Sequence, residues 1–146
     1  MQERTGLLDY SQVPSQTILL FTGNAFVRKD GALVMGRGAA KQVRDLYPGI
    51  DKEFGSKIKE LEDRWHYGLI LLPDRNIGVF QVKYQWYDKA KLDLIEQSVK
   101  KLKYMALYSA QYEIHMNYPG IGNGQLSEEE VYPLIKGLPD NVVIWK

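Results

Sequence analysis

Five short stretches of the chain have the hydrophobic pattern of β-strands. Thr17–Thr22 is a continuous apolar run, too short for a helix and typical of a strand buried on both faces. The other runs that predict strands are Tyr67–Leu72, Ile77–Lys83, Tyr112–Asn117 and Asn141–Trp145. Pro73-Asp74-Arg75-Asn76 separates two of these runs and predicts a hairpin, so that pair is antiparallel.

Segments with helical spacing of apolar residues alternate with these strands. The predicted helices are Ala39–Tyr47, Asp51–Asp63, Lys89–Leu107 and a short one that begins at Ser127. Glu130 stands three residues after Ser127 and completes a capping-box pattern. The alternation predicts an α/β fold of three layers, α/β/α, with a mixed central sheet. At 146 residues, the chain has the length of one domain, which we expect to span 1–146.

Composition and charge exclude several classes of protein. Nineteen Lys and Arg against eighteen Asp and Glu leave a net charge of +1, which excludes a protein that captures duplex DNA mainly by charge. The absence of cysteine excludes disulfides, Cys-ligated zinc, iron–sulfur clusters and thiol nucleophiles. His66 and His115 are too far apart along the chain to suggest a metal site. We therefore expect neither a metal nor a bound cofactor.

The sequence also lacks the signals of membrane insertion or export. No apolar run approaches the roughly 18 residues of a membrane span. Met1–Gln16 is too polar for a signal peptide. We therefore expect a cytoplasmic monomer with no membrane partner.

Two glycine-containing loops each follow a predicted strand and precede a predicted helix. They are Gly36-Arg37-Gly38-Ala39-Ala40 and Pro119-Gly120-Ile121-Gly122-Asn123-Gly124. Ligands of open α/β sheets bind beyond the carboxyl ends of the strands, where both loops must lie. Glycine lets the backbone approach a ligand closely, and the amides at a helix N-terminus point at an anion. A single Gly-x-Gly is more often a simple tight turn, but two such loops indicate a diphosphate site.

Two familiar phosphate-binding motifs do not fit these loops. The dinucleotide fingerprint needs Gly-x-Gly-x-x-Gly directly after the first strand. Here Gly36 lies far beyond Gly23, and Lys41 stands where the third glycine is required. A P-loop is excluded because the chain has no Gly-Lys-Ser/Thr triplet.

Motifs spread from Thr17 to Trp145 carry a resemblance to a known family. They are the strand ending at Asn24, Val34–Ala40 with Tyr47-Pro48, Phe80–Trp86 ahead of Lys91–Glu96, and Pro119–Leu126 with Val131 and Pro133. On these motifs the chain resembles the macrodomain family, specifically the DNA ADP-ribosyl glycohydrolase antitoxins and, more distantly, the terminal ADP-ribose glycohydrolase of animals. The resemblance implies a macrodomain-like fold. It also implies ADP-ribose or an ADP-ribosylated macromolecule, including ADP-ribosylated DNA, as the partner.

The resemblance further implies which residues hold ADP-ribose. Asn24 would hydrogen-bond the distal ribose, and the two loops would enclose the diphosphate and this ribose. The loop residues concerned are Met35, Gly36, Arg37, Gly38 and Ala39, with Gly120, Ile121, Gly122, Asn123 and Gly124. Trp86, in the aromatic cluster Tyr84–Tyr87, is the best candidate for stacking on a nucleobase, although such a ring can equally cover a strand end.

Lys83 falls on the lysine that the glycohydrolase branch uses in catalysis. Spacing alone would favour a solvated charge just past a strand, so the catalytic role comes from the resemblance. A lysine at a strand end, shielded by Tyr84 and Trp86, would have a lowered amine pKa. It would then act as nucleophile or proton carrier at C1″ of the distal ribose.

Three features depart from the family's pattern. Gly124 stands where the animal enzyme has its catalytic aspartate. The antitoxin branch also has glycine at this position. Phe26–Gly31 forms an extra excursion that would either cap the ligand or contact the group to which ADP-ribose is attached. The acidic or amide residue that macrodomains offer to adenine is missing near the chain start, where Asp9 is a weak candidate.

Three functions remain open at this level. The chain is either a hydrolase that removes ADP-ribose from nucleic acid or protein, a non-catalytic reader of ADP-ribose, or a phosphatase for ADP-ribose 1″-phosphate. Lys83 separates the first two, because a reader has no need for an amine beside C1″. The phosphatase would need a general acid or nucleophile that the sequence does not reveal.

Overall fold

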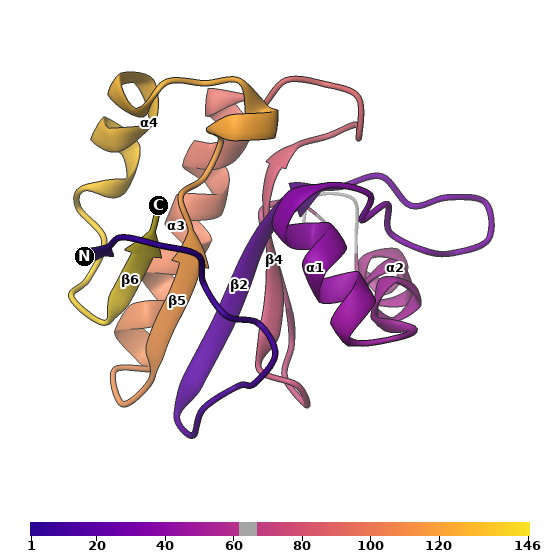
Figure 1. The fold of residues 1–146 in the computed structure, drawn as a ribbon, viewed down its shortest axis with the longest axis horizontal. Coiled ribbons are helices and arrows are strands. Elements are labelled where there is room, and N and C mark those ends of the chain that lie inside the picture. The colour runs from indigo at the N-terminus through magenta and orange to yellow at the C-terminus, as the bar shows by residue number, and fades with distance from the viewer. Residues whose placement is uncertain (62–66) are drawn as a thin grey trace.

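A mixed β-sheet forms the centre of the computed structural model, which describes residues 1–61 and 67–146 (Figure 1). In this described part the sheet has six strands in the order β1-β6-β5-β2-β4-β3. Their bounds are β1 (Gln2–Arg4), β2 (Thr17–Asn24), β3 (Leu69–Leu72), β4 (Ile77–Lys83), β5 (Glu113–Asn117) and β6 (Val142–Trp145). All neighbours are parallel except β3 and β4, which form the predicted antiparallel hairpin.

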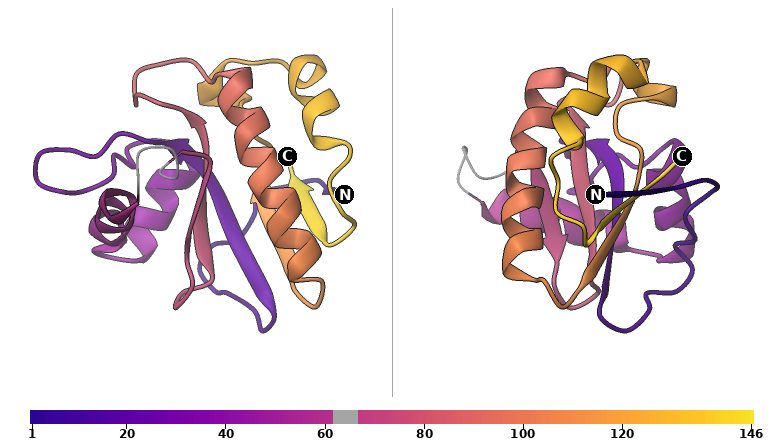
Figure 2. Two further views of the ribbon diagram at one scale, coloured as in Figure 1. Left: turned by 180° about the vertical axis from the view of Figure 1, so that it is seen from behind. Right: turned by 90° about the vertical axis from the view of Figure 1, so that its left-hand side faces the viewer.

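Helices cover both faces of the sheet, which confirms the predicted three layers (Figure 2, left). The helices α1 (Gly38–Leu46) and α2 (Ile50–Glu60) lie on one face, and α3 (Leu92–Tyr108) and α4 (Glu128–Ile135) lie on the other. Within the described residues, none of the helices is long and apolar enough to cross a membrane.

The central strand β2 supplies both hydrophobic cores, because successive side chains of a strand point to opposite faces. Ile18 and Leu20 belong to the core beneath α3 and α4. Leu19 and Phe21 belong to the core beneath α1 and α2. This two-sided burial is the reason that the strand appears in the sequence as a continuous apolar run.

Element boundaries differ from the predicted ones where tertiary contacts compete with helix formation. The helix α3 begins at Leu92 and not at Lys89, because the amides of Ala90 and Lys91 donate to the carbonyls of Gly124 and Val82. The helix α2 ends at Glu60, where Leu61 adopts an extended backbone with φ −85° and ψ 148°. Asp63, the predicted end of this helix, and His66 lie outside the described residues.

The edge strand β1 is missing from the sequence prediction. Gln2, Glu3 and Arg4 are all exposed and show no alternation of polar and apolar residues. They form a strand because they pair in parallel with Val143, Ile144 and Trp145 of β6. A strand whose two faces are both solvated carries no hydrophobic signal.

Candidate functional site

A cavity of about 670 Å³ lies beyond the carboxyl ends of β2, β4 and β5, where both glycine loops open. Most of the residues predicted to form the site line this cavity. They are Asn24, Gly36, Arg37, Gly38, Ala39, Lys83, Trp86, Gly120, Ile121, Gly122, Asn123 and Gly124. The structure therefore brings together residues that are up to a hundred positions apart in the sequence.

The two loops meet across the cavity because glycine occupies left-handed backbone positions in each. Gly38 has φ +57°, and a Cβ built there would lie 3.2 Å from Nδ2 of Asn123. Gly122 has φ +67°, and a Cβ there would meet nothing within 4 Å. At Gly38 the two loops approach each other closely. At Gly122 there is open space next to a backbone conformation that only glycine adopts without strain.

The loops present a series of unused backbone donors. The N–H groups of residues 36 to 40 and of residues 121 to 123 donate to no acceptor within residues 1–61 and 67–146. The first set includes the initial turn of α1, whose N–H groups have no carbonyl partner within the helix. The helix dipole also favours negative charge at this end. Two converging sets of free amides are suited to binding a diphosphate.

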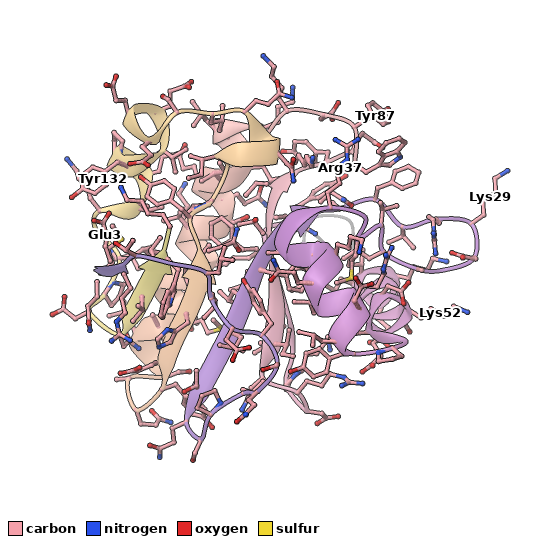
Figure 3. The ribbon with its side chains drawn as sticks, in the orientation of Figure 1. Glu3, Lys29, Arg37, Lys52, Tyr87 and Tyr132 are labelled. Carbon is pink, nitrogen blue, oxygen red and sulfur yellow. The ribbon has the colours of Figure 1, made fainter. Side chains whose placement is uncertain are left out.

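The charged side chains along the described cavity wall are all cationic. Lys83 ends β4, Arg37 precedes the first turn of α1, and Arg28 lies on the excursion, whereas no Asp or Glu is among the lining residues. Figure 3 shows Arg37 at the edge of the sheet above α1. Burial and, after it, the positive charge of Arg37 lower the pKa of the Lys83 amine, while Asp88 raises it. The wall thus favours an anionic ligand and raises the neutral fraction of Lys83.

Asn24 is buried at the end of β2, with only 6% of its surface exposed. It pairs in register with Lys83 on β4, so the residue predicted to bind the distal ribose and the residue predicted to act at C1″ are neighbours. Its Nδ2 donates to the carbonyl of Val34 at 3.0 Å, and its Oδ1 accepts from the amide of Phe26 at 2.9 Å. The side chain retains a second N–H and a lone pair for a ligand.

Sequence reasoning missed a polar pair on the cavity floor. Asn117 ends β5 and donates from Nδ2 to Oγ1 of Thr22 at 2.7 Å, while its Oδ1 accepts from the Thr22 amide at 3.0 Å. Both residues line the cavity, as do Phe26, Arg28 and Val34. The sequence contains a signal for Asn117, because it is a polar residue at the end of a predicted buried strand.

Three of the residues considered in the sequence analysis lie outside the cavity. Met35 is a core residue, 2% exposed, and does not line the cavity. Asp9 accepts hydrogen bonds from Ser11 and is also outside it. The ring of Tyr84 packs edge-on against Tyr67, so Trp86 is the aromatic residue of its cluster that lines the cavity.

Gly124 lines the cavity but has no room for a side chain. A Cβ there would lie 2.9 Å from Cβ of Ala90, whose amide donates to the Gly124 carbonyl at 3.0 Å. An aspartate at this position would require the backbone to move. Any acid–base chemistry in this cavity therefore has to use other groups.

Several solved structures share the fold of this chain. No protein-family model matches the sequence, and no curated protein matches it. The macrodomain of Thermus aquaticus DarG matches with a TM-score of 0.69 and 21% identity, over 99% of this chain and 96% of that one. The macrodomain of Mycobacterium tuberculosis DarG matches with a TM-score of 0.68 and 22% identity, over 99% of this chain and 97% of that one.

A third match was solved with a ligand. Thermosipho africanus DarTG in complex with ADP-ribose has a TM-score of 0.67 and 21% identity, over 89% of this chain. The chain spans 37% of the length of that protein. Together these matches show that the chain has the macrodomain fold.

Proposed function

We propose that this chain is a macrodomain of the DarG branch, that it binds ADP-ribose in the cavity and that it hydrolyses an ADP-ribosyl linkage there. One observation carries the proposal: the free amides of two loops converge beside Lys83 and Asn24, and the described residues of the cavity wall include no carboxylate. The volume of about 670 Å³ falls within the usual range for small-molecule sites. The ADP-ribose bound to Thermosipho africanus DarTG supports the same ligand for this cavity.

The geometry suggests how ADP-ribose is oriented. The diphosphate oxygens accept hydrogen bonds from the amides of both loops, and the distal ribose lies over Asn24 and Lys83 at the ends of β2 and β4. The adenosine then extends in the opposite direction, towards Thr22 and Asn117 on the β5 side. This orientation places C1″ of the distal ribose beside the Lys83 amine.

Hydrolysis breaks the bond between C1″ and the acceptor atom. The bonding electron pair leaves with the acceptor, while water supplies a hydroxyl group to C1″ and a proton to the acceptor. The neutral Lys83 amine assists by attacking C1″ of the ring-opened sugar, from which water later releases it, or by accepting a proton from the attacking water and passing it to the departing group. A reader would not need this amine, and a phosphatase would lack a carboxylate, histidine or cysteine among the described lining residues.

The proposal is tested with three ligands side by side. Calorimetry with free ADP-ribose should show micromolar affinity, since several charged hydrogen bonds contribute roughly 1.5–3 kcal/mol each. The protein should also release ADP-ribose from an ADP-ribosylated single-stranded oligonucleotide or from an ADP-ribosylated peptide. Binding without release from either substrate would leave a reader, and no binding of ADP-ribose would end the proposal.

The pH dependence of turnover tests the state of Lys83. Because the neutral amine is the active form, kcat/KM should rise with pH until the lysine is deprotonated. Arg37→Gln removes a positive charge that lowers the pKa of Lys83, so the rising limb should move to higher pH. Arg37→Lys keeps the charge and should keep the wild-type profile. A kcat/KM that falls with pH over the same range would assign Lys83 the opposite role, that of a charged acid.

A further inference from the structure

A buried tyrosine joins the cavity floor, formed by Thr22 and Asn117, to the N-terminal segment. Tyr10 lies in the irregular stretch between β1 and β2, which crosses the sheet on the side that carries α1 (Figure 1). Its side chain is 3% exposed, belongs to the core beneath α1 and α2, and does not line the cavity. Its hydroxyl proton is shared between the Leu20 carbonyl, with the two oxygens 2.9 Å apart, and Oδ1 of Asn117, at 3.2 Å. A residue outside the cavity wall thus contacts one that lines it.

Tyr10 is itself held by α1. The hydroxyl of Tyr47, at the C-terminal end of α1, donates to the carbonyl of Tyr10 at 2.5 Å. The same helix begins at the first glycine loop, at Gly38. The Tyr10 hydroxyl therefore reaches the floor from a backbone that is fixed against the helix of that loop.

The surroundings of Asn117 determine which way its side-chain amide points. The backbone N–H of Thr22 can only donate, and it lies 3.0 Å from Oδ1 of Asn117. The Tyr10 hydroxyl is the second donor to this oxygen. A flipped amide would place its NH₂ group against the Thr22 N–H, so the flip is excluded. Nδ2 of Asn117 is left to donate to Oγ1 of Thr22, at 2.7 Å.

This arrangement leaves two donors on the floor for a ligand. Nδ2 of Asn117 carries a second proton, because Thr22 uses only the first. The Thr22 hydroxyl accepts that bond and donates to no acceptor within residues 1–61 and 67–146. Both residues line the cavity. Two neighbouring donors suit the oxygen acceptors of a sugar, such as its hydroxyls and its ring oxygen.

We propose that Tyr10 is a positioning residue of the site, and that the floor which it orients binds the adenosine ribose. The inference rests on the proposed function, because it takes the distal ribose to lie over Asn24 and Lys83. The strand β2 lies between β4 and β5 in the sheet. Since two strand spacings amount to about 10 Å, the end of β5 lies at a distance from Lys83 that a diphosphate between two riboses can span.

The Tyr10 hydroxyl acts on binding through the Asn117 amide. Without this hydroxyl, one lone pair of Oδ1 loses its donor beside a buried side chain. The amide would then be less restrained against Thr22, and its free N–H would have to be ordered when the ligand binds. The aromatic ring supplies the packing in the core, so phenylalanine keeps the fold and removes only the orienting contact.

The test compares ADP-ribose with ADP on the Tyr10→Phe protein. ADP lacks the distal ribose but keeps the adenosine half and the diphosphate. Calorimetry should show that affinity falls about three- to tenfold for both ligands, the scale of one neutral hydrogen bond. The kcat for release of ADP-ribose from a modified substrate should stay within about twofold while KM rises, because Lys83 is unchanged.

Ser98→Ala is the matched control for the loss of a buried hydroxyl. Ser98 is fully buried on α3, and its hydroxyl donates to the Gln81 carbonyl of β4 at 2.8 Å. Neither residue lines the cavity. Both Ser98→Ala and Tyr10→Phe should lower the melting temperature, because each removes a hydrogen bond to a carbonyl of a central strand. Ser98→Ala should bind both ligands within about twofold of the wild type, which a purely structural role of Tyr10 would also predict for Tyr10→Phe.

Asn117→Ala completes a double-mutant cycle. Alone it should weaken both ligands by about fivefold or more. Adding Tyr10→Phe should cause no further loss, because Tyr10 acts through Asn117.

Three results would overturn the inference while ADP-ribose still binds to the wild type. They are unchanged affinity in Tyr10→Phe, an equal further loss in the Asn117→Ala background, and a loss for ADP-ribose without a loss for ADP. The last result would place the floor under the distal ribose. The proposed function fails separately, if the wild type binds no ADP-ribose.

Discussion

Lys83→Ala is expected to lose turnover of an ADP-ribosylated substrate by about 10²–10⁴-fold, the usual effect of removing an acid–base group. Affinity for ADP-ribose should remain within a few-fold, because in the proposed binding mode the backbone amides of the two loops hold the diphosphate. Turnover should fall while affinity is kept, because an amine beside C1″ acts on the reacting carbon and contributes little to ground-state binding. Single-turnover release and calorimetry on the same preparation measure the two effects.

Lys103→Ala is the matched control for this substitution. Lys103 is an exposed lysine on α3 and does not line the cavity, so its replacement should leave both turnover and affinity unchanged. If Lys83→Ala releases ADP-ribose as fast as the wild type, Lys83 has no part in the chemistry. The cavity would then need another group to act at C1″, in a wall whose described residues include no carboxylate.

Gly122→Glu is expected to weaken ADP-ribose binding by about 100-fold or more while the protein remains folded. The glycine stands at φ +67° with open space around its missing side chain, so a glutamate would extend into the path of the diphosphate. Its carboxylate would repel the phosphates and displace the ligand from the amides of the loop. Calorimetry with ADP-ribose measures the loss, and thermal unfolding measures the cost to the fold.

Gly49→Glu is the control that distinguishes a loss of ligand binding from the backbone strain of placing glutamate at positive φ. Gly49 also has a left-handed backbone, with φ +88° and no atom within 4 Å of a built Cβ, but it lies before α2 and outside the cavity. Both variants should lower the melting temperature by a similar amount, since each places a non-glycine residue at positive φ. Gly49→Glu should bind ADP-ribose like the wild type. Equal affinities for Gly122→Glu and the wild type would refute the placement of the diphosphate.

Much of the fold can be predicted from the sequence because the relevant signals are local. The buried run of β2, the Pro73–Asn76 turn and the capping box of Ser127 and Glu130 each depend on a few consecutive residues. The capping box forms with the Glu130 amide 3.2 Å from Oγ of Ser127. The positions of the two glycine loops also follow from the alternation of strands and helices.

The sequence by itself determined the order of the elements from β2 onward, the two glycine loops and the lysine at the end of β4. Only the tertiary structure decided that Thr22 and Asn117 pair on the cavity floor and that Met35 turns into the core. It alone showed that Phe26 and Arg28 of the excursion after β2 line the cavity, whereas Lys29 points away from the molecule. These outcomes depend on contacts between segments far apart in the chain. One example is the carbonyl of Gly31, which lies so close to Gly55 of α2 that a side chain there would collide with it. Such contacts form only when the layers pack, so no local pattern of residues encodes them.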